Sequence, residues 1–146
     1  MEIRLLERTD IPFFNKVRND SVCFLHNQTK YSLDDNYSWF DSLDDPYFIL
    51  EMNNEPIGYF RTSNWENNEP YIGLDIQIDS RGNGYAKLAY GIFLNTLRDT
   101  YNITIVHLEV LEVNERAKHI YDKLGFIVTD VQPFGDTNSI KMTMKL

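Results

Sequence analysis

The chain has 146 residues, of which 42% are hydrophobic, and this length predicts one domain, residues 1–146, with a single buried core. Its formal net charge of −8 at pH 7 argues against nucleic-acid binding as its main role, because such proteins concentrate Lys and Arg. The lone Cys23 excludes an internal disulfide framework, and no stretch reaches the roughly 18 apolar residues of a membrane span, so we expect a cytoplasmic protein without a membrane partner.

Hydrophobic spacing and turn residues predict a mixed succession of strands and helices. In chain order the expected elements are a strand at 3–6, a helix beginning at about 10, a helix at 33–43, a strand hairpin at 47–51 and 57–62, a strand at 71–78, a helix at 85–100, a strand at 103–110, a helix at 114–124, and closing strands at 126–131 and 139–144. Residues 20–31 show no clear period and are expected to form a loop that borders a substrate site.

Local patterns support two of these helices. Ser32 and Asp35 form a near capping box for the helix at 33–43. The helix at 85–100 has an apolar stripe that is expected to cover a sheet, formed by Leu88, Ala89, Ile92, Phe93 and Leu97.

The most informative segment runs from Ile76 to Ala86 and leads from an apolar strand through an Arg/Gly loop into a helix. Gly82 and Gly84 allow sharp turns that bring backbone N–H groups close to a ligand, and the helix that begins at about Tyr85 points its positive end the same way. The loop therefore predicts a phosphate or pyrophosphate site, although a plain strand-to-helix turn would use the same glycines. It matches neither the G-x-G-x-x-G fingerprint nor the P-loop.

A second segment, residues 108–126, ends a strand and then forms a short helix. The two segments together resemble the GCN5-related N-acetyltransferase (GNAT) superfamily over residues 71–126, through the motifs Arg81-x-x-Gly84-x-Ala86, Asn114 and Tyr121-x-x-Leu124-Gly125-Phe126. The resemblance implies a mixed α/β fold, with a central and mostly antiparallel sheet, about four flanking helices, and one parallel strand pair that splays apart. It also implies that acetyl-CoA is the co-substrate and lies in that gap.

By this resemblance, backbone amides of the loop would hold the pyrophosphate of acetyl-CoA, with the Arg81 side chain adding charge or bracing the loop. The loop residues concerned are Arg81, Gly82, Asn83, Gly84, Tyr85 and Ala86. Ile76 and Ile78 would pair with the pantetheine arm through main-chain groups, like an added strand. Asn114 would border the cofactor and also cap its helix.

Tyr121 stands where superfamily members commonly place the general acid for the CoA sulfur, although a core tyrosine on the same helical stripe would look identical. Glu109 precedes Tyr121 by twelve residues, a spacing that resembles the ribosomal-protein N-terminal acetyltransferases. Strand alternation puts Glu109 on one face with His107. On an otherwise apolar strand the Glu109 carboxylate would take a proton from the amine, directly or through water; a purely structural carboxylate is the alternative.

Asp75, which lies between Leu74 and Ile76, is the reserve candidate for the base, and a water molecule is the third. His107 is expected to be a structural histidine with satisfied hydrogen bonds. No two histidines have metal-ligand spacing, so no metal is expected.

The first half of the chain is expected to select the acceptor. Residues 18–20 and 32–40 resemble the branch that acetylates amino sugars, polyamines and protein N-termini, in which a histidine often stands where this chain has Asn36. Trp39 and Phe40 are expected to anchor their helix in the core. We therefore expect an N-acetyltransferase for a primary amine of a small molecule such as an amino sugar. Polyamine or protein N-terminal acetylation, and a non-catalytic acyl-CoA-binding module, are the alternatives; monomer and homodimer are both left open.

Overall fold

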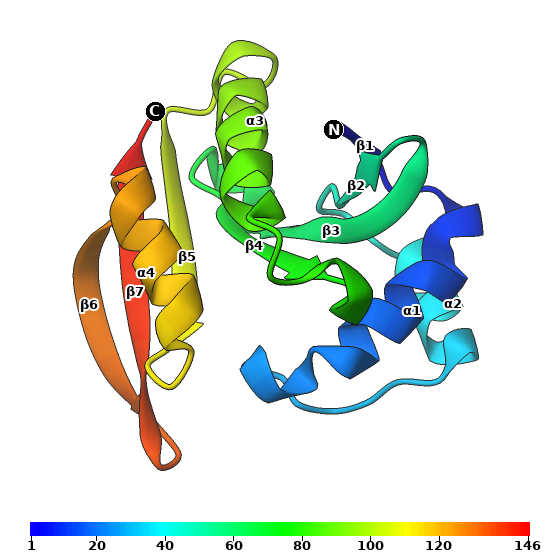
Figure 1. The fold of residues 1–146 in the computed structure, drawn as a ribbon, viewed down its shortest axis with the longest axis horizontal. Coiled ribbons are helices and arrows are strands. Elements are labelled where there is room, and N and C mark those ends of the chain that lie inside the picture. Colours follow the sequence, from blue (N-terminus) through cyan, green and yellow to red (C-terminus); the bar gives the residue numbers. More distant parts are fainter.

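Seven strands form one mixed sheet in the computed structural model, which describes residues 1–146 (Figure 1). In the order of the sheet they are β1 (Glu2–Leu5), β2 (Phe48–Met52), β3 (Glu55–Ser63), β4 (Tyr71–Ile76), β5 (Ile105–Leu111), β7 (Thr137–Lys145) and β6 (Ile127–Phe134). The four α-helices are α1 (Ile11–Asp20), α2 (Leu33–Asp41), α3 (Tyr85–Asp99) and α4 (Glu115–Leu124). All neighbouring strands are antiparallel except β4 and β5, which confirms the expected fold class.

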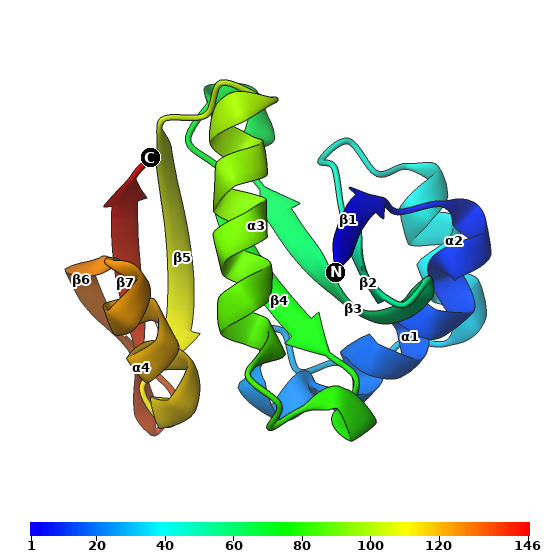
Figure 2. The same ribbon diagram turned by 45° about the horizontal axis from the view of Figure 1, so that its top comes forward.

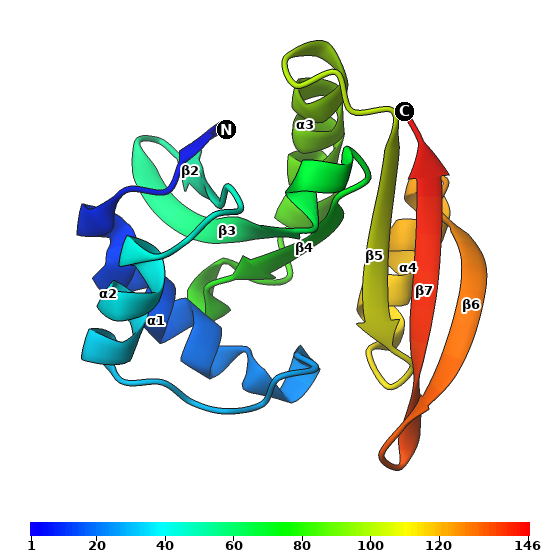
Figure 3. The ribbon, with the colours of Figure 1, turned by 180° about the vertical axis from the view of Figure 1, so that it is seen from behind.

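The parallel strands β4 and β5 touch only at one end. Tyr71 and His107 are their one registered pair, and the His107 N–H donates to the Pro70 carbonyl at 2.9 Å. Beyond this point the strands diverge, and a V-shaped gap opens toward the carboxyl end of each (Figures 1 and 3). The expected splayed pair is therefore confirmed, and the β5-facing main-chain groups of β4 after Tyr71 have no strand partner.

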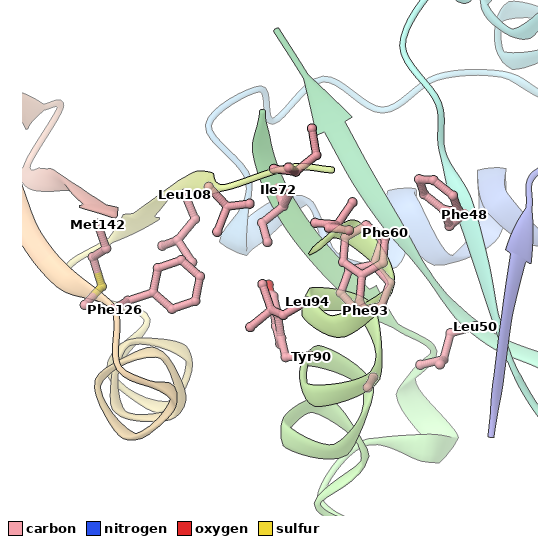
Figure 4. Close-up of a cluster of buried hydrophobic side chains, with 14 of the residues drawn as sticks. Phe48, Leu50, Phe60, Ile72, Tyr90, Phe93, Leu94, Leu108, Phe126 and Met142 are labelled. Atoms are coloured by element: carbon pink, nitrogen blue, oxygen red, sulfur yellow. The ribbon is translucent and has the colours of Figure 1, made fainter. Parts of the chain in front are cut away.

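The helices cover opposite faces of the sheet. Helices α1 and α2 pack on one face of β1–β4, whereas α3 lies on the other face of β4 and α4 covers β5 and β7 (Figures 2 and 3). Each face has its own core. The smaller one consists of Leu6, Ile11, Phe14, Val17, Ile49 and Tyr59. In the larger one, Tyr90 and Leu94 of α3 lie between the Leu108–Phe126 side and the Phe60–Phe48 side of the gap (Figure 4), so α3 joins the two halves of the divided sheet.

The predicted stripe of α3 is only partly right. Ala89, Phe93 and Leu97 are buried as expected, but the Leu88 side chain is 53% exposed. Successive helix residues are turned by about 100°, and the buried stripe also includes Tyr90 and Leu94. These residues move the centre of the stripe away from Leu88, which lies on roughly the opposite side of the helix.

Among the strand boundaries that differ from the sequence-based expectation, two have a clear local cause. Strand β4 ends at Ile76 because a 3₁₀ turn forms over Ile78–Ser80, closed by the Ser80 N–H donating to the Gln77 carbonyl at 3.0 Å. The Ile78 side chain is 55% exposed in this turn, so the prediction that Ile78 extends the strand is wrong. Strand β6 continues to Phe134 through Pro133, because it is an edge strand, where proline is tolerated.

Several local predictions are confirmed. The Asp35 N–H donates to Ser32 Oγ at 3.1 Å and the Ser32 N–H donates to an Asp35 carboxylate oxygen at 3.2 Å, which completes the capping box of α2. The β2–β3 hairpin turns at Asn53 and Asn54, whose φ angles of 53° and 65° lie in the left-handed region that asparagine tolerates. None of the helices combines the length and the apolar character that crossing a membrane requires.

Candidate active site

Two cavities lie beside the diverging strands. The first, called here the loop cavity, measures about 410 Å³ and lies between β4, α3 and α4; its walls include Leu74, Ile76, Arg81, Gly84, Tyr90 and Tyr121. The second, called here the aromatic cavity, measures about 640 Å³; its walls include Phe14, Tyr31, Trp39, Tyr47, Tyr59 and Tyr71. Tyr90 of α3 and Tyr121 of α4 wall the first cavity, whereas Phe14 of α1 and Trp39 of α2 wall the second, so the cavities lie on opposite faces of the sheet.

The Arg/Gly loop forms one end of the loop cavity. Gly82 and Gly84 have φ angles of 80° and 77°, in the left-handed region that favours glycine, and Gly84 is the N-cap of α3. Of the six predicted loop residues, five line the cavity, namely Arg81, Gly82, Gly84, Tyr85 and Ala86. Asn83 instead turns its amide back to the Ser80 carbonyl at 3.2 Å. The backbone at the start of α3 thus faces a cavity, as an anion site requires.

Arg81 braces the loop from within. Its Nε donates to the carbonyl of Ile76, the last residue of β4, at 2.8 Å, and its Nη2 donates to Ser21 Oγ at 3.1 Å. Ser21 Oγ in turn donates to the Val17 carbonyl at the end of α1. The Arg81 side chain was expected either to add charge to the anion site or to brace the loop, and these contacts support the second role.

Sequence reasoning missed the cation that does face this loop. Arg116, in the first turn of α4, lines the loop cavity, and a Cβ placed on Gly82 would lie 3.8 Å from Arg116 Nη2. Its neighbour Asn114 caps α4, with the Ala117 N–H donating to Asn114 Oδ1 at 3.3 Å, and also lines the cavity. Because the resemblance already placed Asn114 beside the cofactor, it could have indicated that the first turn of α4, with Arg116, faces the loop.

Tyr121 lies at the junction of the loop cavity and the larger core. Its hydroxyl accepts a hydrogen bond from the Tyr90 hydroxyl at 3.2 Å, and the two rings meet edge to face at 5.4 Å. Burial raises the pKa of the Tyr121 phenol above its ordinary value of 10.0, while the hydrogen bond from Tyr90 opposes part of the rise. The phenol therefore keeps its proton at neutral pH and borders a cavity as well as the core.

Glu109 lies on the other side of the sheet, lining the aromatic cavity. It shares a strand face with His107, as predicted, but the buried face of β5 is the opposite one, which carries Val106 and Leu108. The expected apolar setting of Glu109 is therefore wrong, because α4 covers only one face of β5. The Glu109 side chain is 46% exposed, and one of its carboxylate oxygens lies 3.9 Å from His26 Nε2.

His26 is a second residue that sequence reasoning undervalued. It lies in the loop between α1 and α2, lines the aromatic cavity, and has its Nε2 2.7 Å from Ser139 Oγ of β7. Burial lowers the pKa of the His26 imidazole, and the Glu109 charge opposes part of the fall. The partners are 113 residues apart in the chain, so no local signal could have joined them.

Asp75, the reserve base, is already paired. Its side chain is 6% exposed, and its carboxylate accepts a hydrogen bond from Arg61 Nε at 3.0 Å. The Arg61 guanidinium lies against Gly73, where a Cβ would come within 2.6 Å of Arg61 Cζ. A glycine inside a strand is a sign of such a close approach.

The remaining candidates behave as structural residues. The His107 ring nitrogens lie 2.8 Å from Thr143 Oγ1 and 3.0 Å from a Glu69 carboxylate oxygen, which confirms a satisfied histidine. Trp39 stacks on Phe14 at 4.7 Å, as its expected anchoring role requires, and also lines the aromatic cavity. No group of three or more His, Cys, Asp or Glu side chains is placed to bind a metal ion.

A family model described as the acetyltransferase (GNAT) family matches residues 14–126. The chain belongs to the GNAT family. The resemblance is confirmed, and the protein is an acetyltransferase whose co-substrate is acetyl-CoA. No curated protein sequence matches the chain.

Solved structures with the GNAT fold match the whole chain at low identity. One is yncA from Salmonella typhimurium with its cofactor acetyl-CoA, at 18% identity, 100% coverage of this chain, 94% of that chain and a TM-score of 0.83. The ribosomal-protein-alanine N-acetyltransferase of Brucella melitensis gives 17% identity, 100% coverage of both chains and a TM-score of 0.82. The F149A mutant of spermidine N-acetyltransferase SpeG from Vibrio cholerae gives 20% identity, covers 99% of this chain and 95% of that chain, and has a TM-score of 0.85. At these identities the matches establish a shared fold.

The loop cavity of this GNAT protein suits the chemistry of CoA. Left-handed glycines and the start of α3 offer N–H groups to a pyrophosphate, and Arg116 adds a cation. The unpaired edge of β4 offers main-chain partners for an extended pantetheine arm.

Proposed function

We propose that the protein is an N-acetyltransferase that transfers the acetyl group of acetyl-CoA to a primary amine of a small molecule. The observation that carries the proposal is the pair of cavities on opposite faces of the β4–β5 gap, one with the Arg/Gly loop and Tyr121, the other with Glu109. Such an arrangement brings a thioester from one face and an amine from the other toward the same opening. Acetyl-CoA supplies the acetyl group and a thiolate leaving group.

In this proposal the chain supplies four functions. Backbone amides from Gly82 to Ala86, with Arg116, bind the pyrophosphate. Main-chain N–H groups on the unpaired edge of β4 meet the oxyanion. Glu109 takes a proton from the amine, directly or through water, and Tyr121 gives the proton at its Oη to the departing thiolate.

Glu109 is favoured over Asp75 as the base. The Asp75 carboxylate is buried and held by Arg61, so taking up a proton would break an ion pair, whereas Glu109 is open to the aromatic cavity. His26 Nε2 lies 3.9 Å from a Glu109 carboxylate oxygen and is placed to accept the proton that Glu109 removes from the amine.

An amino sugar is the first candidate acceptor and a polyamine the second. Aromatic rings and hydrogen-bonding side chains in the aromatic cavity favour the sugar, because apolar sugar faces stack on aromatic rings. Two carboxylates in the same walls, Asp35 and Glu109, favour a cation.

Release of free CoA thiol from acetyl-CoA, measured with a panel of amino sugars, polyamines and N-terminal peptides, tests the proposal. Turnover on a small amine is expected, with a loss of roughly 10²–10⁴-fold in Tyr121→Phe. CoA binding by calorimetry without turnover on any amine would instead support a non-catalytic acyl-CoA-binding module, and failure to bind CoA would reject both readings.

A further inference from the structure

Arg61 lines the aromatic cavity, and most of the hydrogen-bond donors of its guanidinium have no partner within the protein. Only its Nε is engaged, in the 3.0 Å bond to Asp75. Neither terminal nitrogen has a hydrogen-bond partner within the protein, and the side chain is 37% exposed and lines the cavity. A guanidinium carries five N–H donors in a planar fork, so four of them remain available for an acceptor group.

The position of this fork is fixed by its surroundings. The Arg61 guanidinium lies against the backbone of Gly73 on β4, where any Cβ would collide with it, and Asp75 holds it from one side. The other arginine of the cavity is differently committed: the Arg18 terminal nitrogens donate to the Thr29 and Asn27 carbonyls, and its guanidinium lies 4.6 Å from the Tyr31 ring centroid. Arg61 is thus the preorganised cation of the cavity, and Arg18 serves the loop.

The floor of the cavity near Arg61 holds a second unused polar group. The Tyr59 hydroxyl is buried and has no hydrogen-bond partner. Tyr59 and Asp75 are cross-strand partners in the β3–β4 pair, and Tyr59 and Arg61 both line the cavity. The fold therefore leaves unfilled hydrogen-bonding capacity at the place where the guanidinium fork opens.

We infer that the acceptor of this enzyme carries an anionic group, a carboxylate or a phosphate, that binds the terminal nitrogens of Arg61 while its amine lies toward Glu109. Arginine matches carboxylate and phosphate oxygens with two parallel hydrogen bonds. In this arrangement Arg61 binds the anionic group of the acceptor and Glu109 faces its amine. An amino acid or an amino-sugar phosphate carries both groups. This inference rests on the proposed function, and it excludes a simple polyamine as the preferred acceptor.

Matched acceptors test the inference. Each anionic amine is paired with a neutral analogue: L-amino acids with their carboxamides, and glucosamine 6-phosphate with glucosamine, while spermidine serves as the acceptor without an anion. For one of these pairs kcat/KM should favour the anionic member by roughly 10- to 100-fold in the natural protein, as expected for charge-assisted hydrogen bonds. Which pair shows the preference tells a carboxylate from a phosphate.

Variants assign the preference to Arg61. Because each ratio compares two acceptors within one variant, differences in amine basicity cancel between variants. Arg61→Gln should bring the ratio close to one, and Arg61→Lys, which keeps the charge that faces Asp75, should retain a part of it. Gly73→Ala, which displaces the guanidinium without removing it, should also lower the ratio. Arg98→Gln is the matched control, because Arg98 is an exposed arginine in the last turn of α3, away from the cavity. It should leave the ratio unchanged.

Binding separates this inference from the proposed function. Calorimetric titration of CoA into each variant shows whether the variant is folded and whether its loop cavity still binds CoA. Titration of acceptors into the CoA complex then measures how much Arg61 contributes to acceptor binding. Arg61-dependent binding of an anionic member without turnover would sustain the inference and reject the proposed function. An unchanged ratio in Arg61→Gln, a preference for spermidine over every anionic acceptor, or no binding of any anionic member would overturn the inference.

Discussion

Replacing Tyr121 by Phe removes one oxygen from the site and has two separable consequences. If the phenol is the general acid, kcat should fall roughly 10²–10⁴-fold, equivalent to about 3–5 kcal/mol of transition-state stabilisation. The change also leaves the hydroxyl of Tyr90, a residue 1% exposed, without the acceptor that now lies 3.2 Å away. An unsatisfied buried hydroxyl costs about 1–3 kcal/mol of stability, and each kcal/mol lowers the melting temperature of a chain this size by about 2–4 °C.

The double variant Tyr90→Phe/Tyr121→Phe distinguishes the two consequences. It removes both partners of the hydrogen bond, so the free energy of unfolding should recover most of the loss, because replacing a bonded pair by apolar groups of the same shape is nearly neutral. Activity should not recover, since the proton donor is still missing. Tyr90→Phe alone should lower kcat only modestly: the hydrogen bond from Tyr90 lowers the pKa of Tyr121, and its loss makes the phenol a weaker acid.

The assays are thiol release under saturating acetyl-CoA and thermal unfolding of the same preparations. A Tyr121→Phe enzyme with the natural kcat would refute the acid role and make Tyr121 a packing residue. A double variant that regains activity together with stability would show that the single variant failed by unfolding and not by chemistry.

Four further outcomes are expected. Arg81→Ala, which loses its bonds to Ile76 and Ser21, should raise the KM for acetyl-CoA by roughly tenfold with a smaller change in kcat; an unchanged KM in initial-rate measurements contradicts the bracing role. Glu109→Gln should lower kcat by roughly 10²–10⁴-fold near neutral pH and less at high pH, where more of the amine is already deprotonated; equal losses at all pH values argue against a base. Because burial lowers the pKa of His26, the unfolded chain binds this proton more readily, so stability should fall as pH drops below about 6.5; urea unfolding of His26→Asn should show a flatter pH dependence in that range. Burial raises the pKa of Tyr59 well above its ordinary value, so its contribution to stability is complete below about pH 10 and declines as pH rises further; unfolding curves that coincide at pH 9 and 11 would exclude this.

The geometry of the Arg/Gly loop and of the α4 cap could be predicted because its signals are local. The loop at 81–86 and the cap at Asn114 are contiguous motifs, and their glycine and capping residues indicate the local backbone conformation directly. The failure at Ile78 is equally local: its alternation continued the strand pattern, but main-chain hydrogen bonds to Gln77 and Ile78 close a turn there, and side-chain periodicity does not report such bonds.

The walls of the aromatic cavity could not be predicted because their contacts join distant parts of the chain. Alternation placed Glu109 on the correct face of β5 but could not show that α4 covers the other face. His26 gained a role only through Ser139, and Arg61 only through Gly73 and Asp75 on the neighbouring strand. Strand pairing and helix coverage decide which polar residues meet, and these are tertiary facts.

The Arg61–Asp75 pair connects the two sides of the site through its charge. At the Tyr121 phenol the guanidinium lowers the pKa and the carboxylate raises it, so the two effects oppose each other and burial dominates. An anion bound to Arg61 would add negative charge near the phenol and raise its pKa, which keeps the phenol protonated but also makes it a weaker acid toward the departing thiolate. The state of Arg61 would then affect proton transfer as well as acceptor binding. Because Arg61→Gln both removes the fork and leaves the Asp75 charge unopposed, its effect on kcat has to be measured with a neutral acceptor before its effect on recognition of the anion can be assigned.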